Sequence, residues 1–302
     1  MTVRSATSDQ HTARTGIRRW QLQRSLRNLG WYLLLLLVLL ITLGPFVVMI
    51  STSLKAPWEN FTYPPTLLPE QPTPQNYVDA WTKSVVPRGV LNSLIVSVVS
   101  VITNLIFGSL AAFAFARMDF PGRRALFWVV LATMMMPAAV LVVPLMFIIK
   151  HMPGSGTQGW FNTFQGLIIP GAVTAFSVFF MRQYFLGIPR DLDEAATIDG
   201  ASPWGIFWHV ALPLARPGLA IVAIFTFLSR WNEYLWPLII VRNPEMYTAQ
   251  IALRSFVQTY TVEWQQFMAA GVLIALPVLL LYLLLQPYFE ESLGALGRGV
   301  KG

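Results

Sequence analysis

The sequence predicts an all-α integral membrane protein with six transmembrane helices. Of its 302 residues, 55% are hydrophobic and only 12% are charged, and the mean hydropathy is +0.56. A soluble domain carries roughly a quarter of its residues as Asp, Glu, Lys or Arg, so a chain this poor in charge is expected to be covered by a lipid bilayer rather than by water. Six apolar stretches supply the membrane spans.

Each of these stretches reaches the about 20 helical residues that cross a hydrocarbon core about 30 Å thick. They are residues 29–50, 90–116, 125–149, 164–186, 215–240 and 265–287. The sequence lacks the ten-residue alternation of barrel strands, so helices are expected. Prolines fall inside three spans, at Pro137 and Pro144, at Pro237 and at Pro277. Because proline removes a helical hydrogen bond, kinks are expected there.

The basic residues between the spans predict the orientation of the chain in the membrane. Fourteen Lys and Arg residues fall in the tails and connections of one side, and six fall on the other. Positively charged loops stay in the cytoplasm. The basic tail 1–28 and the tail 288–302 are therefore both expected there, flanking a transmembrane domain 29–287. The proline-rich loop 51–89 is then an external cap.

Several classes of site are not expected because their residues are missing. There is no cysteine, and the three histidines are far apart, which argues against thiol chemistry and a clustered metal site. Residues 154–159 have GxGxxG spacing but follow a membrane span rather than a strand, and no GxxxxGK[ST] loop occurs. Arginines before the first span contribute much of the net charge of +7, which indicates a membrane anchor rather than nucleic-acid binding. We expect no catalytic site, cofactor or metal in this chain.

The connection 188–214 between the fourth and fifth spans is specified in detail. Asp191 and Glu194 have the spacing of a capping box, which predicts a short helix beginning near Leu192. Gly200 suits the left-handed residue that ends such a helix. Ser202 is placed to cap a second helix with proline at its first position.

The same connection presents an acidic and partly aromatic surface. Before Ser202 the connection contains four carboxylates and one arginine. A helix that lies on anionic lipid prefers Lys and Arg instead. Two adjacent alanines permit close approach by another backbone, and two tryptophans and a phenylalanine at 204–208 add an aromatic face. Docking of a partner protein is therefore favoured, and an amphipathic helix resting on lipid is the alternative.

This connection resembles the EAA loop of ABC importer permeases. The resemblance rests on three segments in register, Glu194-Ala195-Ala196, Asp199-Gly200-Ala201 and Leu212-Pro213-Leu214. It implies the ABC type I importer permease fold, a non-catalytic subunit of the cell inner membrane, and a coupling helix that docks on a separate ATPase. The implied docking residues are Glu194 for the main polar contact, Ala195 and Ala196 for the close fit, Gly200 for the turn and Asp199 beside it.

The resemblance also implies partners for the chain. An ABC ATPase dimer would bind ATP and Mg, a second homologous permease would complete the pathway, and an extracytoplasmic solute-binding protein would deliver the solute. Membrane lipid would surround the spans, and nucleic acid is not a partner.

Two further segments narrow the expected solute. Residues 231–238 resemble the fifth-span signature of carbohydrate-uptake permeases, and residues 299–302 are similar to the tail of the shorter permease of maltose-type systems. A sugar or oligosaccharide is therefore the expected solute class. Glycerol-phosphate-type substrates are the alternative, because their importers resemble the same fifth-span signature.

Two charged residues are expected inside the fifth span. Arg230 and Glu233 are three positions apart, so they can pair on a helix, and a lone charge at that depth costs on the order of 2.5–3.5 kcal/mol. The pair either joins span five to its neighbours or, with Trp231 and Asn232, lines the translocation pathway. Weaker pathway candidates, which suit interhelical hydrogen bonds better, are Asn92, Asn104 and Gln183.

Two other classes of membrane protein are less favoured. An ion-coupled secondary transporter would show internally repeated spans and several intramembrane carboxylates, for which Glu233 alone is thin support. A polytopic membrane enzyme would need a nucleophile with its base, or a set of metal ligands.

Overall fold

The computed structural model describes residues 6–64, 66–154, 158–257 and 263–299, and these residues form helices joined by turns and loops, without a β-strand among them. Four helical segments are each long and apolar enough to cross a membrane. They are Asn28–Ser53, Val86–Arg117, Phe164–Leu186 and Trp264–Leu284. Two bent helix pairs raise the number to six if each pair is one span.

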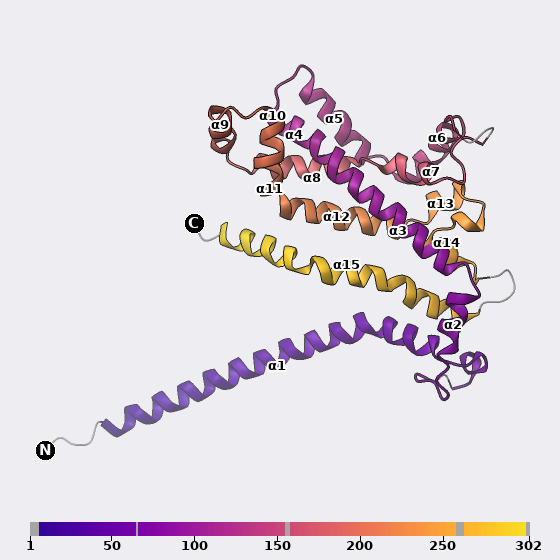
Figure 1. Cartoon of the computed structure of the whole chain (residues 1–302). Coiled ribbons are helices and arrows are strands. Elements are labelled where there is room, and N and C mark those ends of the chain that lie inside the picture. Colours follow the sequence, from indigo (N-terminus) through magenta and orange to yellow (C-terminus); the bar gives the residue numbers. More distant parts are fainter. Residues whose placement is uncertain (1–5, 65, 155–157, 258–262, 300–302) are drawn as a thin grey trace.

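The first helix lies apart from the others. Helix α1 (Ala6–Ser53) extends away from the bundle and meets α15 (Trp264–Gly299) only near its C-terminal end (Figure 1). Within the span Asn28–Ser53, the most apolar stretch of 18 residues contains no residue that is buried within the subunit. Its apolar surface is therefore available to lipid or to another subunit.

The bundle is built around α12 (Arg216–Trp231). One buried cluster joins this helix to α4 (Ser109–Arg117) and α8 (Ala175–Leu186), and a second joins it to α3 (Val86–Thr103), α15 and α14 (Ala249–Arg254). A π-helical turn at Asn104–Gly108 connects α3 to α4 without interrupting the span.

The third predicted span is not one continuous helix. Residues 125–149 are divided between α5 (Arg123–Met134) and α6 (Ala138–Lys150), whose axes are bent by 105°. The break lies at Pro137, whose ψ of 129° is extended. Proline disfavours a helical conformation in the residue before it, which explains a break here, whereas Pro144 is accommodated inside α6.

The fifth predicted span, residues 215–240, is also wrong as a continuous helix. Helix α12 ends at Trp231, three residues of irregular backbone follow, and α13 covers Leu235–Ile240. Pro237 lies in the first turn of α13, where a missing backbone N–H is tolerated.

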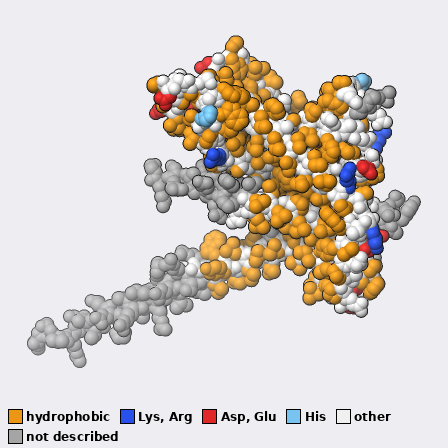
Figure 2. Space-filling model, viewed as in Figure 1, with side chains coloured by type: hydrophobic (Ala, Val, Ile, Leu, Met, Phe, Trp, Pro, Cys, Tyr) orange, Lys and Arg blue, Asp and Glu red, His pale blue; other side chains and the backbone are white. Residues whose placement is uncertain are grey.

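The loop between the first two spans is ordered by its own polar contacts. It contains the short helices η1 (Pro57–Phe61) and α2 (Gln75–Thr82). The carboxylate of Glu59, only 3% exposed, accepts backbone N–H groups from Ala56, Glu70 and Gln71. Figure 2 shows apolar side chains over the middle of the visible face and charged side chains toward its two ends, as expected for a protein that spans a bilayer.

Candidate functional sites

The predicted two-helix connection is present between α8 and α12. It consists of α9 (Asp191–Ile198), α10 (Pro203–Ile206), a π turn at Phe207–Ala211 and α11 (Leu212–Leu214). The chain bends by 77° where this segment meets α12. Figure 1 shows α9 and α10 at one end of the bundle, far from α13 and α14.

Two of the predicted local signals are confirmed. Gly200 has φ of +86°, the left-handed conformation that glycine adopts without strain. The N–H of Ala201 donates to Ala196 O at 2.9 Å, closing the turn after α9. The side chain of Ser202 accepts the N–H of Gly205 at 3.2 Å, with proline at the first position of α10.

Two other local predictions are wrong. Helix α9 already begins at Asp191, with Arg190 at its N-cap and no side-chain cap, so the capping box does not form. Its acidic first turn still suits the positive end of the helix dipole. The aromatic face is also divided: Phe207 is 1% exposed and packs on Phe113, with 5.3 Å between ring centroids, whereas the two tryptophans stay at the surface.

Most of the predicted docking residues lie at the surface. Glu194, Ala195, Asp199 and Gly200 are exposed, and Ala196 is half-buried against the core beneath α9. Apolar side chains accompany them, with Ile198 86%, Trp204 60% and Trp208 42% exposed. The exposed surface thus combines a carboxylate, small residues and large apolar groups, which together suit a protein partner.

The residue that holds this connection from beneath was not among the predicted site residues. Arg117, which contributed only to the count of basic residues, is nearly buried at the end of α4 and forms an ion pair with Asp193 of α9. The two residues are far apart in the sequence, so no local pattern indicates their contact. The available signal was an arginine placed where a span ends.

The predicted pairing of the charges in the fifth span is confirmed. Arg230 Nη1 lies 2.6 Å from Glu233 Oε2, and their side chains are 13% and 30% exposed. Both side chains line a cavity of about 230 Å³. Residues of α6, Pro170 and the first residues of α13 complete its lining. The breaks before α6 and after α12 therefore meet at one cavity, and irregular backbone at membrane depth is tolerated where it is buried in protein or lines such a space.

A glycine positions this arginine. In the 3₁₀ helix η4 (Ile169–Gly171), which follows α7 (Phe164–Ile168), a Cβ atom on Gly171 would overlap the guanidinium of Arg230. The carbonyl oxygen of Gly171 accepts Asn104 Nδ2 at 3.0 Å, and Asn104 Oδ1 accepts the N–H of Thr174 at 2.8 Å. Asn104 thus makes interhelical hydrogen bonds, as predicted from the sequence.

Arg230 also lines a second cavity, of about 190 Å³. Three hydroxyl side chains and two aromatic rings complete its lining, namely Thr174, Thr226, Ser229, Phe176 and Phe225. The centroids of the two rings are 5.5 Å apart. The sequence did not indicate this grouping, because it requires α8 and α12 to be packed together.

The other pathway candidates lie elsewhere. Trp231 is 1% exposed, stacks on Phe227 and donates its indole N–H to Ile274 O at 3.2 Å. Asn232 is exposed and its amide donates to Leu228 O at 3.0 Å.

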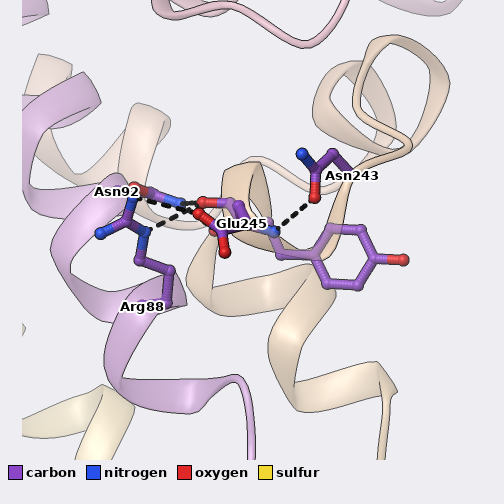
Figure 3. A network of polar contacts seen from close by, with 5 residues as sticks. Arg88, Asn92, Asn243 and Glu245 are labelled. Atoms are coloured by element: carbon purple, nitrogen blue, oxygen red, sulfur yellow. Dashed lines mark hydrogen bonds and ion pairs between the residues drawn. The ribbon is translucent and has the colours of Figure 1, made fainter.

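Asn92 belongs to a separate polar network (Figure 3). Its side chain is 1% exposed and donates to the carbonyl oxygens of Glu245 and Tyr247, at 2.8 and 2.9 Å. Arg88 donates to the same Glu245 oxygen at 3.1 Å. Among the pathway candidates named from the sequence, Arg230 and Glu233 alone line a common cavity.

Comparisons with known proteins agree with this architecture. Residues 104–294 match the family described as "Binding-protein-dependent transport system inner membrane component". The diacetylchitobiose uptake system permease protein NgcG of Streptomyces coelicolor is 36% identical over 84% of this chain and 83% of its own length. The sn-glycerol-3-phosphate transport system permease protein UgpE of Yersinia pestis is 32% identical over 86% of this chain and 93% of its own length.

A solved structure has the same fold. It is a chain of a bacterial ABC transporter involved in the import of the acidic polysaccharide alginate, with a TM-score of 0.76 and 25% identity over 95% of this chain and 100% of that chain. Because the family match covers more than half of the sequence and the fold is that of ABC importer permeases, the chain belongs to the binding-protein-dependent transport system inner membrane components.

Proposed function

We propose that this chain is the permease subunit of an ATP-driven importer for a sugar or oligosaccharide. The observation that carries the proposal is the exposed connection α9–α11, which offers Glu194 and a glycine turn at one end of a membrane bundle. Its relatives support the solute class, since one takes up diacetylchitobiose and others belong to arabino-oligosaccharide systems. A glycerol-phosphate-type solute is the second candidate, supported by the relative of that transport system.

In this proposal α9 docks on a separate ABC ATPase dimer that holds ATP and Mg. Glu194 and Asp199 supply charge, Ala195 and Ala196 allow close approach, and Gly200 makes the turn. Ile198, Trp204 and Trp208 add apolar area that is too exposed to be explained by packing within the subunit. We propose that this end of the bundle and both terminal tails face the cytoplasm, as the distribution of basic residues predicts.

The translocation pathway is proposed to run past Arg230 and Glu233. Hydroxyl groups of Thr174, Thr226 and Ser229 beside two phenylalanine rings suit a solute that is polar at its edges and apolar on its faces, as a sugar ring is. A second permease would close these open cavities, and an extracytoplasmic solute-binding protein would deliver the solute.

The test is transport by the reconstituted complex of this chain, its partner permease, the ATPase and the binding protein. We expect uptake of radiolabelled oligosaccharide that requires ATP inside the vesicle and is insensitive to proton and sodium gradients. Uptake of glycerol phosphate instead would select the second candidate. Uptake driven by an ion gradient without ATP would contradict the proposal and favour a secondary transporter.

A further inference from the structure

A single arginine joins three elements beneath the docking connection. Arg117 is the last residue of α4, and its side chain is only 6% exposed. One nitrogen of its guanidinium, Nη2, donates to Phe185 O at 2.7 Å and to Ile188 O at 2.6 Å. The other, Nη1, lies 3.2 Å from Oδ2 of Asp193, in the first turn of α9. Helices α4, α8 and α9 therefore share one cationic group.

The chemistry of the guanidinium suits this position. The last carbonyl groups of a helix have no partner within it and carry the negative end of the helix dipole. Phe185 provides such a carbonyl in the last turn of α8, and Ile188 provides another two residues beyond the end of the helix. Nη2 of Arg117 donates to both while Nη1 meets a carboxylate. Lysine, with one compact ammonium group, cannot reproduce this geometry.

This ion pair is a principal buried link between α9 and the membrane bundle. None of the residues of α9 is fully buried, and its apolar contact with the core is made by half-buried Ala196. The side chain of Asp193 is 19% exposed. Within the described part of the chain, Arg117 Nε and Asp193 Oδ1 have no hydrogen-bond partner, so no second polar contact there replaces the pair if it is lost.

We propose that Arg117 is a positioning residue for the coupling helix. Through Asp193 it fixes the orientation of α9 against α4 and α8, so that a movement of the docked ATPase is passed to the spans instead of being absorbed by rotation of α9. The coupling role rests on the proposed docking of α9, whereas the fixed orientation of α9 does not.

The variants Asp193→Asn and Arg117→Gln test this role. Asp193→Asn keeps the side-chain shape and removes the charge, and Asp191→Asn makes the same change at an exposed position of the same helix. Because the chain has no cysteine, cysteines introduced at exposed Ile198 of α9 and exposed Ile102 of α3 are its only sites for spin labels. The distance distribution between the labels is measured in the full-length permease pair before the ATPase is added.

We expect a broader label distribution in Asp193→Asn and Arg117→Gln, and an unchanged one in Asp191→Asn. In the complete, unlabelled complex, solute-stimulated ATP hydrolysis should fall by roughly two- to thirtyfold for the first two variants, while ATPase binding and basal hydrolysis persist. If Arg117→Gln does not assemble, Asp193→Asn carries the test alone.

Two results would overturn the proposal. An unchanged distribution in Asp193→Asn would show that the pair does not hold α9, and wild-type stimulation despite a broadened distribution would show that its orientation is irrelevant to coupling. Failure of the docking proposal has a different signature: Glu194→Lys would then leave ATPase binding and stimulation intact, while the label distributions still respond to Asp193→Asn.

Discussion

The guanidinium of Arg230 packs directly against Gly171, so a side chain at position 171 would displace it. A Cβ atom on Gly171 would overlap the guanidinium, and the same glycine carbonyl is held by Asn104. The glycine is thus required for the position of the charge, rather than for an unusual backbone angle. Single substitutions can therefore separate packing at this cavity from its polarity.

The first prediction concerns this glycine. Gly171→Ala should displace the arginine, at an overpacking cost of about 1–3 kcal/mol, and lower both the melting temperature of the complex and solute uptake. Gly30→Ala is the matched control, because no atom lies within 4 Å of the added methyl group in this chain. Uptake and melting temperature that are the same for both variants would disprove the steric role of Gly171.

The second prediction concerns the charge pair. If the cavity is part of a water-filled pathway, as proposed, water solvates a surviving partner, so Arg230→Gln and Glu233→Gln should assemble nearly normally. Uptake should fall by about tenfold or more, since a hydrogen bond to a charged group contributes roughly 1.5–3 kcal/mol. Complex yield and uptake are measured for both single variants and the double variant. Poor yield of the singles that the double variant restores would instead identify a structural ion pair.

At the scale of elements, the loop after α1 shows how a long connection is held without regular structure. Glu59 accepts three backbone N–H groups from two parts of the loop, and Lys55, also buried, donates to Thr66 O. The hydrogen bond from the backbone of Glu70 is the main cause that lowers the pKa of Glu59. The ionised carboxylate therefore organises the loop.

The third prediction is a pH dependence of this loop. A lowered folded-state pKa means that the stabilisation is fully present above the ordinary glutamate range and is lost as the pH falls through the lowered pKa. Cleavage of the loop by an acid-tolerant protease should therefore increase at acidic pH in the wild type. In Glu59→Gln the loop should be susceptible already at neutral pH. Glu70→Gln, which leaves the backbone donor in place, should resemble the wild type; equal susceptibility of all three would contradict the assignment.

At the scale of the whole molecule, the connection α9–α11 and the loop after α1 lie at opposite ends of an apolar body (Figures 1 and 2). Helix α1 and the exposed surfaces of α5 and α6 remain uncovered within the subunit. Under the proposed function, one chain encloses only part of a pathway, so its open cavities are expected to face the second permease.

The fourth prediction tests the orientation. A reporter enzyme that is active only outside the cytoplasm should work when inserted near Gln71 or Gln158, and should be silent near Gly122 or after the C-terminus. The reason is the excess of basic residues on the proposed inner side. An active fusion near Gly122 would show that the connection between the second and third spans lies outside the cytoplasm. It would thereby contradict the proposed cytoplasmic position of Glu194.

The sequence determined the features that depend on neighbouring residues. The apolar stretches, the turn at Gly200, the cap at Ser202 and the pairing of Arg230 with Glu233 all follow from hydropathy or from spacings of a few positions. Such interactions are local, so they can be recognised before the chain is folded. The same local reasoning failed at Asp191, because its side chain does not cap α9.

Only the tertiary structure decided which side chains are buried and which helices break. Phe207 and Trp231 are buried because α4 and α15 pack against them. Asn92 donates to a carbonyl oxygen of a residue 153 positions away. The contact of Arg117 with Asp193 and the meeting of two helix breaks at the Arg230 cavity likewise require distant segments to pack together. Burial and long-range pairing depend on the three-dimensional arrangement of the helices, which no spacing within one segment specifies.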